Sequence, residues 1–241
     1  MRKLLLAFLL IGFIGSSTLW ADTMTFITPA GSTDTAGDAV SARAVVTTGA
    51  NTVSIQLFNL VTDQKDVGQS VTDFSFTLGG AAISGASIGS SSGTAVAVGS
   101  GGAISSTTAG VDAKWGLGES GNTLTLDWFS RTHQSGAGNA AYTILGPVCS
   151  SGDYCAANGS IASNPAHNPF IQSELDFTLN ASGVTSDTAI SDPVFSFGTT
   201  AGDDVDGVPS TSPVPEPASL GLMGIGLVGL ALVVRRKRLI A

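Results

Sequence analysis

The chain has 241 residues, of which 18 are acidic and 10 are basic. Six of the basic residues lie at the two ends, so the segment from Asp22 to Val214 holds 4 basic and 17 acidic residues, a formal net charge of −13. Such an acidic surface repels phosphate backbones and anionic lipids, which excludes nucleic-acid binding and membrane adhesion by charge. The length fits one domain with a core of its own.

The first residues have the pattern of a secretory signal peptide. Arg2 and Lys3 precede an apolar run from Leu4 to Ile14, and small residues lead to Ala21. A permanent membrane span needs about 20 apolar residues to cross a ~30 Å hydrocarbon core, so this run is too short. We predict that residues 1–21 are a signal peptide, which directs the chain through the secretion translocon and is then removed.

Residues 22–201 alternate apolar and polar side chains with the period of half-buried β-strands. Five segments place large apolar residues on one face, between turn-forming residues. These residues are Val53, Ile55 and Leu57; Phe74, Phe76 and Leu78; Leu124, Leu126 and Trp128; Leu175, Phe177 and Leu179; and Phe195 and Phe197. We predict an all-β body, an antiparallel β-sandwich of jelly-roll-like form, flanked by the signal peptide and a C-terminal transmembrane sorting helix.

Two segments have compositions that favour irregular structure. Residues 79–110 are rich in Gly and Ser, and we expect a flexible segment with one or two weak strands, of which "TAVAV" is the best candidate. Residues 202–213 are predicted to be an acidic, proline-containing linker. Its Asp203, Asp204 and Asp206 are oxygen ligands of the kind that calcium takes, but they lack the order of an EF-hand loop. A solvated linker without a cofactor is the simpler interpretation, and calcium is the alternative.

The chain has two cysteines, Cys149 and Cys155, separated by "SSGDY". An exported chain meets an oxidising compartment, and the residues between the cysteines favour a turn, so we predict a structural disulfide. The spacing is not that of a redox C-x-x-C pair.

Catalytic interpretations have less support in the sequence. Residues 89–93 match the G-x-S-x-G pattern of a hydrolase nucleophile, but they lack the strand and helix that should flank it. His133 and His167 have no triad spacing, with Asp127 or Asp176 as candidate partners on paper. A polysaccharide hydrolase would need paired carboxylates, for which Glu119 and Glu174 are candidates. Trp115 and Trp128 could stack on a sugar ring, although core packing is expected for Trp128.

The C-terminal residues combine three features. Pro215 and Pro217 hold the chain around Glu216 in an extended form. Residues 218–234 are uncharged and would span about 25 Å as a helix, which is short for a ~30 Å core. Four cations then follow, and by the positive-inside rule they remain in the cytoplasm. These are Arg235, Arg236, Lys237 and Arg238.

In the order, spacing and position of these features, residues 214–241 resemble the PEP-CTERM sorting signal. The resemblance implies that an exosortase, a multi-spanning membrane enzyme with its own catalytic cysteine, cuts near the Pro-Glu-Pro element. It implies that Pro215, Glu216 and Pro217 are recognition elements, that residues 218–234 are a transient inner-membrane anchor, and that the four cations stop transfer. Proteins with this tail occur in Gram-negative bacteria that make extracellular polysaccharide.

We therefore expect an exported protein that ends at the cell surface or outside the cell. A non-catalytic, structural or adhesive role in biofilm or exopolysaccharide is the leading hypothesis, with extracellular polysaccharide as a possible partner. One alternative is a secreted polysaccharide hydrolase. Another is a permanently anchored surface protein that binds glycans or calcium.

Overall fold

The computed structural model describes residues 23–80, 83–129, 141–200 and 202–210. In this part of the chain the regular structure consists of thirteen β-strands and two short 3-10 helices, η1 and η2. The strands are β1 Thr23–Ile27, β2 Ala42–Gly49, β3 Thr52–Asn59, β4 Val71–Leu78, β5 Ser87–Val98, β6 Ile104–Val111, β7 Gly116–Ser120, β8 Thr123–Asp127, β9 Ile144–Leu145, β10 Phe170–Asn180, β11 Ile190–Phe197, β12 Asp204–Asp206 and β13 Val208–Pro209. The 3-10 helices are η1 Val67–Gln69 and η2 Ser100–Gly102. The prediction of an all-β fold is confirmed.

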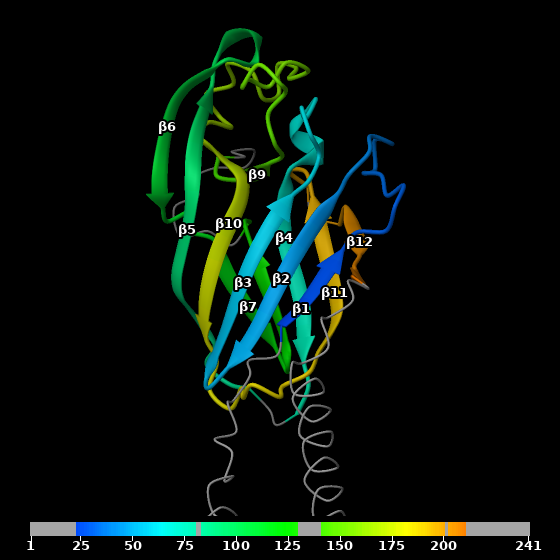
Figure 1. Cartoon of the computed structure of the whole chain (residues 1–241), viewed down its shortest axis with the longest axis vertical. Helices are drawn as coiled ribbons and strands as arrows, with labels where there is room; N and C mark the ends of the chain where they lie inside the picture. Colours follow the sequence, from blue (N-terminus) through cyan, green and yellow to red (C-terminus); the bar gives the residue numbers. More distant parts are fainter. Residues whose placement is uncertain (1–22, 81–82, 130–140, 201, 211–241) are drawn as a thin grey trace, which may run out of the picture. The chain divides into compact units, whose positions relative to one another are not determined.

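The strands form two antiparallel ladders that β9 connects. The β10 ladder has the order β13-β1-β2-β3-β10-β5-β6, and the β4 ladder has the order β12-β11-β4-β8-β7. Strand β9 pairs antiparallel with β4 and parallel with β10, so the sheet is mixed and not purely antiparallel. Figure 1 shows β4, β7 and β11 behind β2 and β3.

The main core includes all of the residues that the alternation pattern picked out, together with others such as Ala44 and Val46 on β2. Each of the five predicted segments forms a strand or its direct continuation, and their large apolar side chains are at most 3% exposed. Phe74 on β4 packs against Phe195 on β11, with ring centroids 5.0 Å apart. Burying one such side chain stabilises the fold by roughly 1.5–3 kcal/mol.

Residues 79–110 are more regular than we expected. They contain the twelve-residue strand β5 and all but the last residue of the eight-residue strand β6, where one or two weak strands were predicted. Strand β5 pairs with β10 along most of its length. A Cβ atom at Gly93 would lie 3.0 Å from side-chain atoms of both Ile171 and Leu175, so glycine here permits close contact with β10. Small residues in this segment therefore reflect close packing between strands.

The predicted linker, residues 202–213, is also partly folded. Strand β12 pairs with β11, and β13 pairs with β1. Val205 packs against the core from the middle of β12. Residues 204–206 and 208–209 are therefore strands, where an irregular linker was expected, because both find hydrogen-bonding partners at the ends of the two ladders. Asp204, Asp206, Val208 and Pro209 are nevertheless exposed to solvent.

A second, smaller core lies under the disulfide loop. It is formed by β5, β9, the start of β10 and the loop that follows β9. Its buried members are Val96, Val98, Leu145, Tyr154, Ile161 and Phe170. We call residues 23–210 the β-domain, because both cores are built within this range.

Candidate functional site

The two ends of the β-domain meet on one strand pair. Phe26 on β1 lies opposite Pro209 on β13, and the amide of Ser210 donates to the carbonyl of Thr25 at 2.8 Å. Ser210, the last described residue, is thus bonded to β1 and lies five residues before Pro215 in the sequence. The strand that begins the β-domain thus also holds the segment that leads to the predicted recognition element.

The predicted sorting residues lie outside the described residues. This holds for Pro215, Glu216 and Pro217, for the apolar segment 218–234, and for the four cations. Within the part of the chain that the structure describes, no helix has the length and apolar character required to cross a bilayer.

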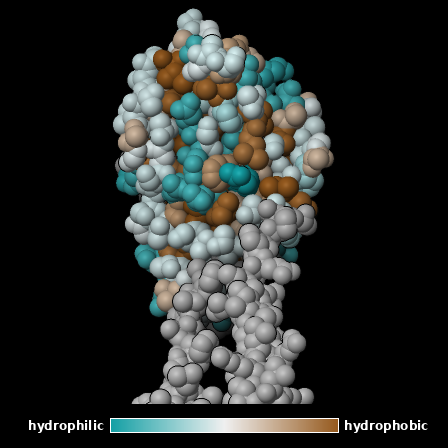
Figure 2. Space-filling view, viewed as in Figure 1, coloured by the Kyte–Doolittle hydropathy of each residue, from teal (hydrophilic) through white to brown (hydrophobic). Residues whose placement is uncertain are grey.

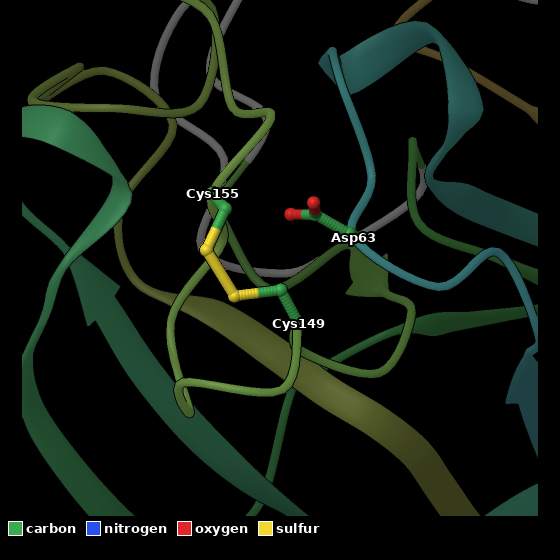
Figure 3. Close-up of side chains that lie close together, drawn as sticks. All are labelled: Asp63, Cys149 and Cys155. Carbon is green, nitrogen blue, oxygen red and sulfur yellow. A yellow bond between two sulfur atoms is a disulfide. The ribbon is translucent and has the colours of Figure 1, made fainter.

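The disulfide between Cys149 and Cys155 is confirmed. The two Cα atoms are 6.0 Å apart, and the bridge closes a loop in which the amide of Cys149 donates to the carbonyl of Asp153 at 2.8 Å. Figure 3 shows Asp63 beside the bridge. Its carboxylate accepts a hydrogen bond from the amide of Ala156 at 2.8 Å. Because both sulfurs are bonded to each other, this group of residues is a structural anchor and not a thiolate metal site.

The loop places Tyr154 in the second core. The Tyr154 side chain is fully buried, and its hydroxyl donates to the carbonyl of Gly146 at 3.0 Å. Its amide donates to the carbonyl of Gly102 at 3.0 Å, next to the connection between β5 and β6. Burial also raises the pKa of the Tyr154 phenol, so it stays neutral over the physiological range. The disulfide loop thus ties β9 to the β5–β6 hairpin.

Replacing both cysteines with serine is expected to lower the free energy of unfolding by about 2 kcal/mol. A bridge across so short a loop removes limited entropy from the unfolded chain. Denaturant titration of wild type and variant, with and without a reducing agent, measures this. Reductant should lower wild-type stability to that of the variant and leave the variant unchanged. A loss below about 0.5 kcal/mol would contradict a stabilising role.

The predicted calcium ligands do not come together. The Asp203 carboxylate accepts hydrogen bonds from the amide and hydroxyl of Thr35, at 3.1 and 3.2 Å. Asp204 accepts a 2.6 Å hydrogen bond from the hydroxyl of Ser196 on β11, and Asp206 is exposed on β12. Asp203 and Asp204 therefore fasten the C-terminal segment to the fold.

A different acidic cluster is present, formed by Asp34, Asp38 and Asp66. One carboxylate oxygen from each lies within 4.8 Å of the others. Asp34 accepts a hydrogen bond from the amide of Asp38, Asp38 pairs with Lys65 at 3.4 Å, and Asp66 caps η1 through the amide of Gly68. Burial raises the pKa of Asp66, and the hydrogen bond from Gly68 opposes this while Asp38 and Asp34 add to it.

The acidic cluster borders a pocket of about 230 Å³ that Asp203 also lines. The sequence alone does not indicate this cluster, because Asp66 is distant from Asp34 and Asp38 in the sequence and comes close to them only in the folded chain. Each of the three carboxylates has a structural partner, so the cluster stabilises the turn before β2 and the start of η1.

A polar pocket of about 330 Å³ lies where β10 bulges beside β5 and β6. Glu174 and Asp176 line it together with hydroxyl and amide side chains. Burial raises the pKa of Glu174, and Asp176 raises it further by repulsion and by a hydrogen bond. Gln56 on the neighbouring β3 donates to the Glu174 carboxylate at 3.1 Å. Carboxylates among hydroxyl groups suit a hydroxyl-rich ligand.

The predicted carboxylate pair is divided between the two ladders. Glu174 is on β10, whereas Glu119 is on β7 at the end of the β4 ladder. The Glu119 carboxylate accepts a hydrogen bond from the amide of Ala86 at 2.8 Å, which fixes the chain that leads into β5. Glu119 therefore has a structural role, and it does not line the pocket that contains Glu174.

Both tryptophans are core residues. Trp115 is 4% exposed and Trp128 is 1% exposed. Their indole N–H groups donate to the carbonyls of Tyr142 and Ala141, at 3.0 and 2.7 Å. The core prediction for Trp128 is confirmed, and sugar stacking on Trp115 is wrong because its ring packs against Phe177.

The G-x-S-x-G match lies inside a strand. Residues 89–93 are part of β5, and the Ser91 hydroxyl donates to Asp112 at 2.6 Å. A nucleophile elbow requires a sharp strand-to-helix turn, which β5 does not have here. His133 lies outside the described residues, and His167 lies against the carbonyl of Ser160 and the side chain of Asn164.

Comparison with known proteins identifies the C-terminal segment. The family model of the PEP-CTERM protein-sorting motif matches residues 213–237. No curated protein and no solved structure matches the chain. The match covers the Pro-Glu-Pro element, the apolar segment and three of the four cations. The chain therefore carries a PEP-CTERM protein-sorting motif and is an exported substrate of the exosortase system, anchored in the membrane before it is processed.

Proposed function

We propose that the β-domain is a non-catalytic structural or adhesive component of a biofilm or exopolysaccharide matrix. In this proposal an exosortase cuts near Pro215, Glu216 and Pro217, and the β-domain reaches the cell surface or the medium. Its two ladders act as a jelly-roll-like sandwich around the shared core. The observation that carries the proposal is the sorting motif, which begins three residues after the last described residue of the fold, Ser210.

The hydrogen bonds of the polar side chains support a structural role. Ser91, Glu119 and Asp203 each bond to another segment of the fold, and so does the buried Asn59. The amide of Asn59 donates to the carbonyls of Gln69 and Ile144, at 2.9 Å each. Groups held in this way rigidify a scaffold.

The pocket on β10 favours a second candidate function, binding or cleavage of polysaccharide. Glu174 combines a raised pKa with the nearby carboxylate of Asp176, which is a feature of acid–base pairs. Hydrolysis of a glycosidic bond also needs a second carboxylate at a separation of roughly 5–9.5 Å across the substrate. Asp176 is the other described carboxylate that lines this pocket, but its hydrogen bond to Glu174 holds it closer than this separation, so the pocket favours polysaccharide binding over cleavage.

One set of measurements separates these functions. The exported protein is purified and incubated with a panel of extracellular polysaccharides, with and without calcium, and both binding and new reducing ends are measured. The structural proposal expects recovery with the matrix fraction of the culture and no new reducing ends. If wild type releases new reducing ends and Glu174→Gln does not, the protein is a hydrolase and the structural proposal is rejected. Binding that requires calcium would favour the calcium-dependent alternative.

A further inference from the structure

The outer edge of the β10 ladder is the strand β6. Six consecutive residues of β6, Ser105 to Gly110, are exposed. In the described part of the chain β6 pairs with β5 and with no other strand. One side of its backbone therefore presents N–H and C=O groups that a further strand can bind.

The side chains of β6 do nothing to prevent such pairing. Natural edge strands are usually short, charged, broken by proline or a β-bulge, or covered. Strand β6 has eight residues, "ISSTTAGV", with no charged residue and no proline. The pairing with β5 has a register shift on each side of the middle of β6. Between the shifts, Ser106, Thr107 and Thr108 pair in unbroken register with Ala97, Val96 and Ala95. Figure 2, in the view of Figure 1, shows a mostly pale surface on the side of β5 and β6, as Ser, Thr and Gly give.

The strands at the other three ends of the two ladders have features that hinder pairing with a further strand, and β6 lacks these features. Strand β12 has three residues, and Asp204 and Asp206 are exposed on it. Strand β13 has two residues, and one is Pro209, which has no N–H to donate. Strand β7 is fastened through Glu119 to the segment that leads into β5. Among the described strands, β6 is thus the long, uncharged edge.

The charge of the chain indicates which partner fits this edge. Two copies with a net charge of −13 between Asp22 and Val214 repel each other wherever acidic faces meet. Contact along β6 avoids this, because no acidic residue lies between Ile104 and Val111. Around a twofold axis at Thr107 the strand is its own antiparallel partner, with Ser106 opposite Thr108 and Thr107 opposite its own copy, which are favourable cross-strand pairs. Two acids next to this edge are already bonded within the fold: Asp112 pairs with Lys114, and Asp153 accepts a hydrogen bond from the amide of Ile104 at 3.1 Å.

We propose that β6 is a self-association edge, at which two copies of the chain join their β10 ladders through antiparallel β6–β6 pairing. The contact is centred on Thr107 and involves Ser105 to Ala109 of each copy, so that Ser106 lies opposite Thr108. It is an isologous contact, so it yields a closed dimer. The proposal does not depend on which polysaccharide, if any, the protein binds.

Complementary charge variants test the pairing. Ser106→Lys with Thr108→Lys places like charges opposite each other in a homodimer, and Ser106→Glu with Thr108→Glu does the same. Sedimentation velocity on the purified exported protein should show a wild-type dimer and roughly tenfold or more weaker dimerisation for each variant alone. An equimolar mixture of the two variants should recover the dimer as a mixed pair.

Controls separate the edge from general charge effects. Ser54→Lys places a lysine at an exposed position of the central strand β3 and should leave the dimer intact. Thermal unfolding of each variant shows that the fold is retained. A wild-type protein that is monomeric at high micromolar concentration would overturn the proposal. So would an open polymer, or dimers that persist in both variants, because the contact would then lie elsewhere.

Discussion

Replacing Asp73 with asparagine is expected to stabilise the β-domain at neutral and alkaline pH and to remove most of its stability change between about pH 4 and pH 8. Burial raises the pKa of Asp73 from 3.8 to about 8, and the charges of Asp127 and Asp204 add to this. Asp73 lies directly opposite Asp127 on β8, and opposite Ser196 on β11, whose own partner on β12 is Asp204. Three carboxylates therefore lie in one row across adjacent strands.

The sign of the pH effect follows from where the proton is held. Between the unfolded pKa of 3.8 and the folded pKa of about 8, the folded chain keeps a proton on Asp73 that the unfolded chain has lost. The free energy of unfolding therefore falls as the pH rises through this range and levels off above it. Asparagine is uncharged, like the protonated carboxyl group, so the free energy of unfolding of the variant does not fall in this way as the pH rises.

The expected gain for Asp73→Asn is roughly 3 kcal/mol at pH 8.5, since each pKa unit corresponds to about 1.4 kcal/mol and solvent screening reduces the full shift. Denaturant titrations from pH 4 to pH 9 measure it. Asp112→Asn is the matched control. Burial raises the pKa of Asp112, but hydrogen bonds from Lys114 and Ser91 lower it by more, so the net shift is downward. Replacing the Asp112 carboxylate should therefore not stabilise the β-domain. If Asp73→Asn is no more stable than wild type at pH 8.5, the pKa of Asp73 is not raised in the folded chain.

The strands that sequence reasoning found are those with large apolar residues at alternate positions. In β4 and β10 the alternation is local, and any fold that buries one face preserves it. Strand β2 was not singled out, although Ala42, Ala44 and Val46 alternate and are fully buried, because alanine gives little contrast with its polar neighbours. The pattern thus depends on side-chain size as well as on period.

The elements that sequence reasoning missed depend on contacts between distant segments. Gly93 fits against Ile171 and Leu175, which lie 78 and 82 residues further along the chain, so glycine content alone could not distinguish packing from flexibility. The same holds for the acidic cluster, since Asp66 reaches Asp34 only in the folded chain. The disulfide could be predicted because both cysteines and the turn between them are local.

The sorting motif is the part of the function that the sequence predicts most directly, because a linear element read by another protein needs no fold. Replacing Pro215, Glu216 and Pro217 with alanine is expected to block processing. Alanines remove the extended backbone that the prolines impose and the carboxylate between them. The triple variant should then be recovered from membranes with its C-terminus intact, whereas wild type should lose about 25 residues on export.

Intact mass of the exported and membrane fractions distinguishes these outcomes. Pro209→Ala is the matched control, since it removes a proline from β13, six residues before Pro215, and should be processed like wild type. Wild type found only in membranes at full length would show that residues 218–234 are a permanent anchor. Release of the triple variant at the wild-type mass would show that the enzyme reads the apolar segment and the cations without the Pro-Glu-Pro element. Because β13 is held to β1 at Ile27 and Val208, cleavage beyond Ser210 leaves the pairing of the two ends of the β-domain unchanged.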